Sequence, residues 1–139
     1  MRLMKMAGAM VLFFAVPAMA QAPTFHPVGT VHQIMLGIVV PTSDVIFKVP
    51  NEAPKTDAEW ATVQNSALML AESGNLLLLP GRAIDTGEWA KDAMALVTAG
   101  SAAYKAANAK DADAVADAGN KIYDTCEGCH TKYLPKPAQ

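Results

Sequence analysis

The chain has 139 residues, of which 11 are Lys or Arg, 13 are Asp or Glu and 52% are hydrophobic. This length suits a single domain. No cluster of lysines and arginines is present to neutralise phosphates, so nucleic acid is excluded as an expected partner.

The first 20 residues are typical of a secretory signal peptide. Arg2 and Lys5 form a basic start, an apolar run follows, and Ala18-Met19-Ala20 is a small-x-small cleavage pattern. The apolar run is about half of the roughly 20 residues that span a bilayer, which disfavours the alternative of a retained anchor. We therefore expect a signal peptide at 1–20, export to the periplasm, and no membrane span in the mature domain, residues 21–139. Cleavage would give that domain a net charge of −4, which favours a partner with a basic or a neutral apolar face.

Helix-forming residues dominate the mature chain, and no convincing run alternates apolar and polar residues. Apolar residues at three- and four-residue steps predict four helices, at about 28–49, 57–79, 86–107 and 111–133. Pro41 lies inside the first of them and predicts a kink or a break there. Short connections between four helices predict an all-α fold, an antiparallel up-down-up-down four-helix bundle whose core can hold a cofactor.

Local signals mark where the second helix begins and how it packs. Thr56-x-x-Glu59 matches a capping box at its start. The row of apolar residues that this helix is expected to bury begins at Trp60, and the corresponding row in the third helix begins at Trp89. Three glycines lie in helix interiors, where each costs up to about 1 kcal/mol relative to alanine. They are Gly74, Gly100 and Gly119. Close approach of a neighbouring helix or room for a ligand would offset the cost; the alternative is that the helices simply tolerate it.

The last helix carries Cys126-Glu127-Gly128-Cys129-His130, the C-x-x-C-H pattern of covalent haem attachment. Residues three apart on a helix face the same way, so both thiols can reach neighbouring vinyl groups of one porphyrin. His130 follows directly, and its imidazole can then coordinate the iron. The motif predicts one covalently bound haem c.

Three other readings of the two cysteines fit less well. A thioredoxin-like C-x-x-C lies at a helix start after a strand, whereas this one lies near the end of the last helix. A zinc site needs a fourth ligand, and His26 and His32 lack zinc-site spacing to the motif. A disulfide across a two-residue gap is strained on a helix.

A single C-x-x-C-H near the C-terminus, after three other helices, resembles the class II c-type cytochromes, the cytochrome c-prime family and its low-spin relatives. The resemblance covers the mature chain in architecture, but only the five-residue motif is specific. It implies haem packed between the first and last helices, often in a homodimer. The chain departs from the family at two points: Pro41 is unusual, and the arginine expected near the haem propionates is absent. His32 is its nearest counterpart, for which we expect a propionate contact or simple exposure to solvent, and coordination of the iron in place of Met35 is the weaker alternative.

In this family the first helix supplies the side chain on the distal side of the iron. The resemblance implies that a methionine there gives six-coordinate iron suited to electron transfer, whereas leucine or phenylalanine leaves a site for small gases. Met35 is the candidate ligand, and core filling is the alternative role for it. If His32 occupies the position of the family's arginine, the distal position lies four residues later and is Leu36 instead. The two side chains point about 100° apart on a helix, so only one can face the iron.

The expected function is electron transfer to redox protein partners in the periplasm, with His130 and Met35 as axial ligands. The alternative is a five-coordinate gas-binding protein with Leu36 on the distal side. A third hypothesis is a small haem peroxidase that uses His32, or a subunit of a larger oxidoreductase. No nucleophile–base pair, phosphate loop or second metal cluster is visible in the sequence, so we do not expect an enzyme. Tyr133 is expected at the haem edge and Arg82 at a propionate, and simple exposure to solvent is the alternative for each.

Overall fold

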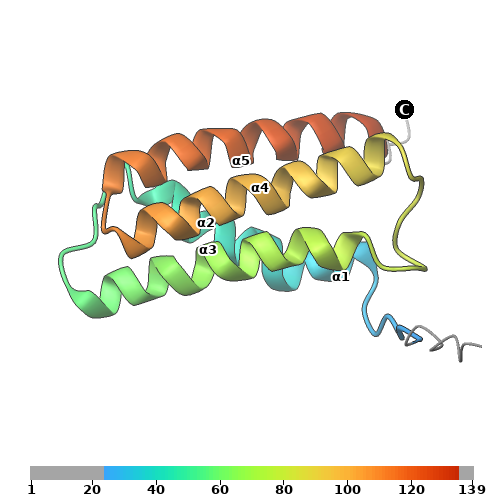
Figure 1. Ribbon diagram of the computed structural model, residues 1–139, viewed down its shortest axis with the longest axis horizontal. Coiled ribbons are helices and arrows are strands. Elements are labelled where there is room, and N and C mark those ends of the chain that lie inside the picture. The colour runs from blue at the N-terminus through green and yellow to red at the C-terminus, as the bar shows by residue number, and fades with distance from the viewer. Residues whose placement is uncertain (1–23, 135–139) are drawn as a thin grey trace, which may run out of the picture.

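The computed structural model describes residues 24–134, and in this part of the chain the protein is all-helical and has no strand. Four long helices pack against one another (Figure 1). The first is continuous but has three parts, and the helical segments are α1 (Val31–Ile34), η1 (Met35–Val39), α2 (Val40–Lys48), α3 (Asp57–Leu77), α4 (Glu88–Asn108) and α5 (Ala112–Tyr133). The all-helical class with four helices is confirmed. The signal peptide expected at 1–20 lies outside the described residues.

Side chains at the helix starts satisfy backbone N–H groups that have no partner within the helix. At the start of α3, the Glu59 N–H donates to Thr56 Oγ1 (3.2 Å) and the Thr56 N–H donates to Glu59 Oε2 (2.9 Å). The predicted capping box is therefore present. At the start of α5, Asp111 Oδ1 accepts a hydrogen bond from the Ala114 N–H at 2.9 Å. Such caps each stabilise a helix by about 1 kcal/mol, so these two starts are determined locally.

Two helices begin a few residues later than the apolar pattern predicts. The first begins at Val31 because Thr30 is its N-cap, and Gln33 completes a capping box. The third long helix begins at Glu88 because the Asp85 carboxylate binds two backbone N–H groups ahead of the regular turns. Asp85 Oδ1 accepts from Gly87 N at 2.8 Å and from Trp89 N at 3.1 Å. Polar side chains at the N-terminal ends thus make both helices begin later in the chain than predicted.

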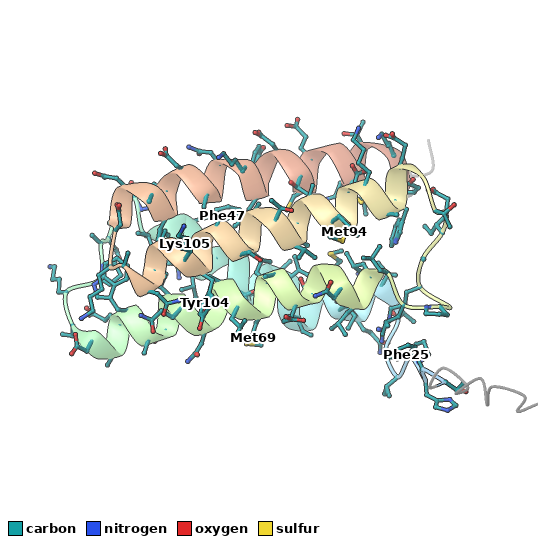
Figure 2. The ribbon with its side chains drawn as sticks, in the orientation of Figure 1. Phe25, Phe47, Met69, Met94, Tyr104 and Lys105 are labelled. Atoms are coloured by element: carbon teal, nitrogen blue, oxygen red, sulfur yellow. The ribbon has the colours of Figure 1, made fainter. Side chains whose placement is uncertain are left out.

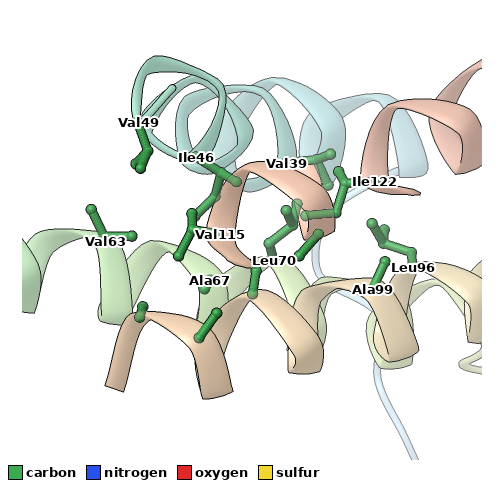
Figure 3. Packing of buried hydrophobic residues seen from close by; sticks show 14 of the residues in the cluster. Val39, Ile46, Val49, Val63, Ala67, Leu70, Leu96, Ala99, Val115 and Ile122 are labelled. Carbon is green, nitrogen blue, oxygen red and sulfur yellow. The ribbon is translucent and has the colours of Figure 1, made fainter. Parts of the chain in front are cut away.

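The core is one cluster to which all four long helices contribute side chains (Figure 3). Ile46 of α2, Leu70 of α3, and Val115 and Ile122 of α5 are each 0% exposed. Burial of one such side chain contributes about 1.5–3 kcal/mol. Met69 and Met94 instead lie at the surface, each 47% exposed (Figure 2).

Helices α3 and α4 approach each other closely at two glycines. A Cβ added to Gly74 would lie 2.6 Å from Val97 Cγ2, and one added to Gly100 would lie 2.7 Å from Ala71 N. Close helix approach therefore explains these two glycines. A Cβ on Gly119 would be 3.5 Å from its nearest neighbour, an ordinary contact distance.

The kink predicted at Pro41 takes the form of a π-helical turn, and the helix continues through it. The segment η1 lies directly before the proline, and its hydrogen bond runs from the Val40 N–H to the Met35 carbonyl. The chain thus remains helical from Val31 to Lys48. No helix within residues 24–134 is long and apolar enough to cross a membrane.

Candidate functional site

The C-x-x-C-H motif lies in the last turns of α5, next to the first helix, α3 and α4. Cys126 and Cys129 are both free and half-buried, and His130 is more exposed. All three line a small cavity of about 30 Å³. Apolar residues from three other helices form much of the remaining wall: Met35, Val39, Leu77, Ala93 and Leu96. The packing of four helices thus brings the motif into contact with a largely apolar space.

A second, larger cavity of about 330 Å³ adjoins the motif. It shares Met35, Cys129 and His130 with the small cavity. Apolar and aromatic side chains dominate the rest of its lining, which consists of Val31, His32, Ile84, Trp89, Tyr133 and Leu134. The two cavities therefore adjoin each other at the same three residues.

Of the two first-helix residues considered for the distal position, Met35 lies at the motif and Leu36 does not. Met35 is half-buried and lines both cavities. Leu36 is 61% exposed and lines neither. His32 has an exposed side chain that lines only the larger cavity.

Tyr133, expected at the haem edge, and Arg82, expected at a propionate, differ in their position relative to the cavities. Tyr133 lines the larger cavity. Arg82 is buried, only 8% exposed, and lies outside the lining of both cavities. Its Nε donates to the Gly29 carbonyl at 3.0 Å and its Nη1 to the Leu76 carbonyl at 3.2 Å. Arg82 therefore holds the loop after α3 against the segment that precedes the first helix.

One charged residue at the site was not anticipated from the sequence. Asp92 of α4 lines the small cavity with a side chain that is only 15% exposed. Its Oδ2 is buried, has no hydrogen-bond partner among the described residues, and lies 3.9 Å from Lys132 Nζ. The sequence feature that could have pointed to Asp92 is its position three residues after Trp89, beside the buried face of α4. A carboxylate thus faces the same space as the two thiols.

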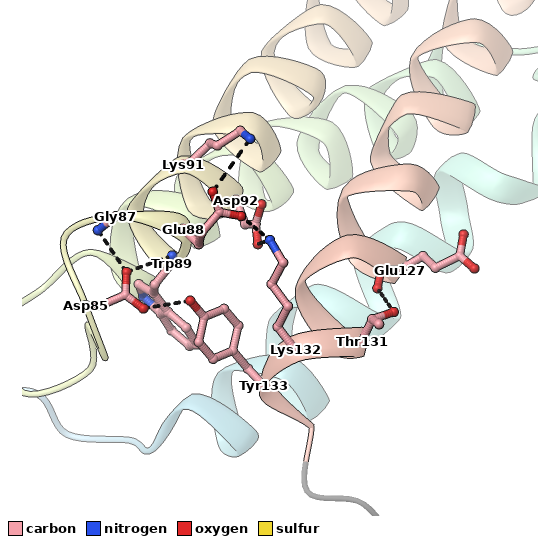
Figure 4. Close-up of polar contacts among 10 residues, drawn as sticks. All are labelled: Asp85, Gly87, Glu88, Trp89, Lys91, Asp92, Glu127, Thr131, Lys132 and Tyr133. Atoms are coloured by element: carbon pink, nitrogen blue, oxygen red, sulfur yellow. Dashed lines mark hydrogen bonds and ion pairs between the residues drawn. The ribbon is translucent and has the colours of Figure 1, made fainter.

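The end of α5 is fastened to the start of α4 by polar and aromatic contacts (Figure 4). Lys132 forms an ion pair with Glu88. The Tyr133 hydroxyl donates to Asp85 Oδ2 at 2.6 Å. The Tyr133 ring also meets the Trp89 ring edge-to-face, with centroids 5.0 Å apart. These contacts fix the turn that carries His130.

Burial and hydrogen bonds shift the pKa values of both thiols, of Tyr133 and of Asp85. Burial raises the pKa of the Cys126 thiol. Burial also raises that of Cys129, and the neighbouring Asp92 charge adds to the effect. The hydrogen bond to Asp85, with burial, raises the pKa of Tyr133 to about 12, and the same bond lowers the pKa of Asp85. Both thiols are therefore protonated at neutral pH.

Within residues 24–134, no three side chains of His, Cys, Asp or Glu are grouped so that they could hold a metal ion. Comparisons of the chain with protein-family models, with curated proteins and with solved structures find no match.

Proposed function

We propose that this protein is a monohaem c-type cytochrome that carries electrons. Cys126 and Cys129 would hold the haem through thioether bonds, and His130 and Met35 would be the iron ligands. A bound haem supplies reversible one-electron transfer at its iron. The observation that carries the proposal is the position of Met35, which lines both cavities together with Cys129 and His130.

The two cysteines suit attachment of one porphyrin. They are one helical turn apart, they are both half-buried, and they line the same small cavity. Their raised pKa values keep them as thiols, whereas redox-active cysteines are typically thiolates with lowered pKa values. The chemistry of the pair therefore favours structural attachment over disulfide exchange.

The surrounding side chains suit an apolar ring with one polar edge. Trp89 and Tyr133 provide aromatic walls in the larger cavity, and Val31 adds an aliphatic one. His32, whose exposed side chain lines that cavity, would contact the propionates. The buried position and hydrogen bonds of Arg82 favour a structural role for it.

Met35 and Leu36 distinguish the proposed carrier from a gas-binding protein. A histidine–methionine ligand pair leaves no open position on the iron and raises its reduction potential. Because Leu36 is 61% exposed, its side chain does not compete with Met35 for the space beside His130. This arrangement favours electron transfer over gas binding.

The scaffold and partners form part of the same proposal. We infer an antiparallel up-down-up-down bundle, which the short connections 49–56, 78–87 and 109–111 support. Ile84 and Leu134, 63% and 57% exposed, lie at the larger cavity and give a redox protein partner an apolar surface to contact. Export to the periplasm, removal of residues 1–20 and a homodimer complete the proposal.

The test is to express the full chain in a host that attaches c-type haem. The mature protein should carry one haem by mass, and Cys126→Ser with Cys129→Ser should abolish attachment. The reduced wild-type protein should not take up carbon monoxide. Met35→Leu should bind it readily and should lose the spectral signature of thioether ligation.

Met69→Leu and Met94→Leu are matched controls, because both methionines lie at the surface, 47% exposed, and line neither cavity at the motif. Both should retain the wild-type spectrum. Colourless mature protein of apoprotein mass would refute haem attachment. Carbon monoxide uptake by the wild-type protein would refute methionine ligation and would favour the gas-binding alternative.

A further inference from the structure

The first helix contains one turn that does not follow α-helical geometry. In η1 the Val40 N–H donates to the Met35 carbonyl, five residues earlier, where an α-helix would use the fourth. A π-helical turn of this kind accommodates one residue more than the α-helical turn it replaces. The structure is regular α-helix on either side.

Pro41 explains why the extra residue is placed here. Proline has no N–H, and in an α-helix its ring clashes with the carbonyl four residues earlier, which here belongs to Gly37. The wider turn directly before the proline relieves that clash. The Thr42 hydroxyl donates to the Ile38 carbonyl at 2.6 Å and so adds a side-chain hydrogen bond where the backbone ladder is interrupted.

The extra residue changes which side chains face the bundle. Ile34 and Val39 are both buried, although five residues of α-helix turn by about 500° and would point them about 140° apart. The π-helical turn absorbs the difference and brings both to the core. Without it, every residue before the turn would be rotated by one step of about 100°. Met35 would take the direction that Ile34 now has, and Leu36 would take the direction that Met35 now has.

We propose that the π-helical turn at residues 35–39, set by Pro41, selects Met35 rather than Leu36 as the side chain that faces His130. Pro41 and Gly37 are then positioning residues, because neither lines the cavities at the motif. This inference rests on the proposed haem ligation. It adds that the helix register, and not only the presence of a methionine, determines the ligand.

Deletion of Gly37 in a Pro41→Ala background tests the role of the turn, because Pro41 would clash with the preceding turn once the segment is regular α-helix. Gly37 is exposed, and a Cβ built on it meets nothing within 4 Å, so its loss removes the extra residue without removing a packing contact. The segment would then become ordinary α-helix with Ile34 four residues before Val39. We expect the deletion variant to fold and to retain the thioether signature and the wild-type potential. Insertion of one alanine after Gly37 should abolish the signature.

Exchange of the two side chains tests the register at unchanged length. The double variant Met35→Leu with Leu36→Met should lose the thioether signature, and its reduced form should bind carbon monoxide. Retention of the signature in this variant would overturn the inference, because position 36 would then face the iron. Misfolding of the deletion variant made in the Pro41→Ala background, or loss of its signature, would also overturn it. The Met35→Leu single variant separates these results from failure of the proposed function, since unchanged spectra there would refute Met35 ligation itself.

Discussion

Replacement of Gly100 by alanine should destabilise the protein, although alanine is the better helix former. The gain in helix propensity is about 1 kcal/mol. Against this, the new Cβ would lie 2.7 Å from Ala71 N and 2.8 Å from Ala71 Cα. Both atoms belong to the backbone and cannot rotate away, so α3 and α4 must separate. Overpacking of this kind costs about 1–3 kcal/mol, and backbone contacts place the cost in the upper half of that range.

The net effect of Gly100→Ala is a loss of about 1–2 kcal/mol in the free energy of unfolding. For a chain of this size, 1 kcal/mol corresponds to about 3 °C in Tm, so Tm should fall by about 3–6 °C. Thermal and urea unfolding followed by circular dichroism would measure both quantities.

The matched control is Gly119→Ala in the interior of α5. Its Cβ would lie 3.5 Å from Ile46 Cγ2 and 3.7 Å from Phe47 Cδ1, which are ordinary contact distances. Here the propensity gain has no opposing clash, so this variant should be more stable by up to about 1 kcal/mol. Equal shifts in the two variants, or a Gly100→Ala protein as stable as the wild type, would refute the argument that helix spacing requires Gly100.

Two further predictions concern charges near the motif. Because Tyr133 has its pKa raised from 10 to about 12, the stabilisation it provides should be complete below pH 10 and disappear between pH 10 and 12. NMR of labelled tyrosine, assigned with Tyr133→Phe, should show this titration, and Asp85→Asn should return it toward pH 10; a Tyr133 titration near pH 10 in the wild type would contradict the hydrogen bond. If the protein binds haem as proposed, Asp92→Asn should raise the reduction potential by an amount on the order of tens of mV, because a carboxylate with only 15% of its side chain exposed at the site favours the ferric state. Asp113→Asn, at the far end of α5, changes the net charge equally and should shift the potential less; equal shifts would show that Asp92 acts only through net charge.

The sequence predicted those parts of the fold that depend on neighbouring residues. The Thr56–Glu59 capping box and the Asp111 cap involve groups within three residues of each other, so local pattern is sufficient to find them. Both rows of apolar residues that begin at a tryptophan are buried as expected, because three- and four-residue spacing places side chains on one face of a helix. The same reasoning placed Cys126 and Cys129 on one face of the last helix.

The sequence could not predict contacts between residues far apart in the chain. Asp92 meets the motif of α5 only because α4 packs beside it, and nothing in the sequence around Asp92 indicates that neighbour. Arg82 lies in a loop, where an arginine is usually exposed to solvent. Its side chain is nevertheless buried and donates hydrogen bonds to the carbonyls of Gly29 and Leu76. Long-range packing assigns both roles.

The sequence alone determined that the chain is helical, where α3 and α5 begin, and that two thiols and an imidazole share one end of the last helix, because these follow from spacing and from local hydrogen bonds. The tertiary structure decided which first-helix residue meets that end. Pro41 indicated a distortion of the helix, but both Ile34 and Val39 must be buried, and only the packed helices impose that requirement. The π-helical turn satisfies it, and Met35 lines both cavities at the motif.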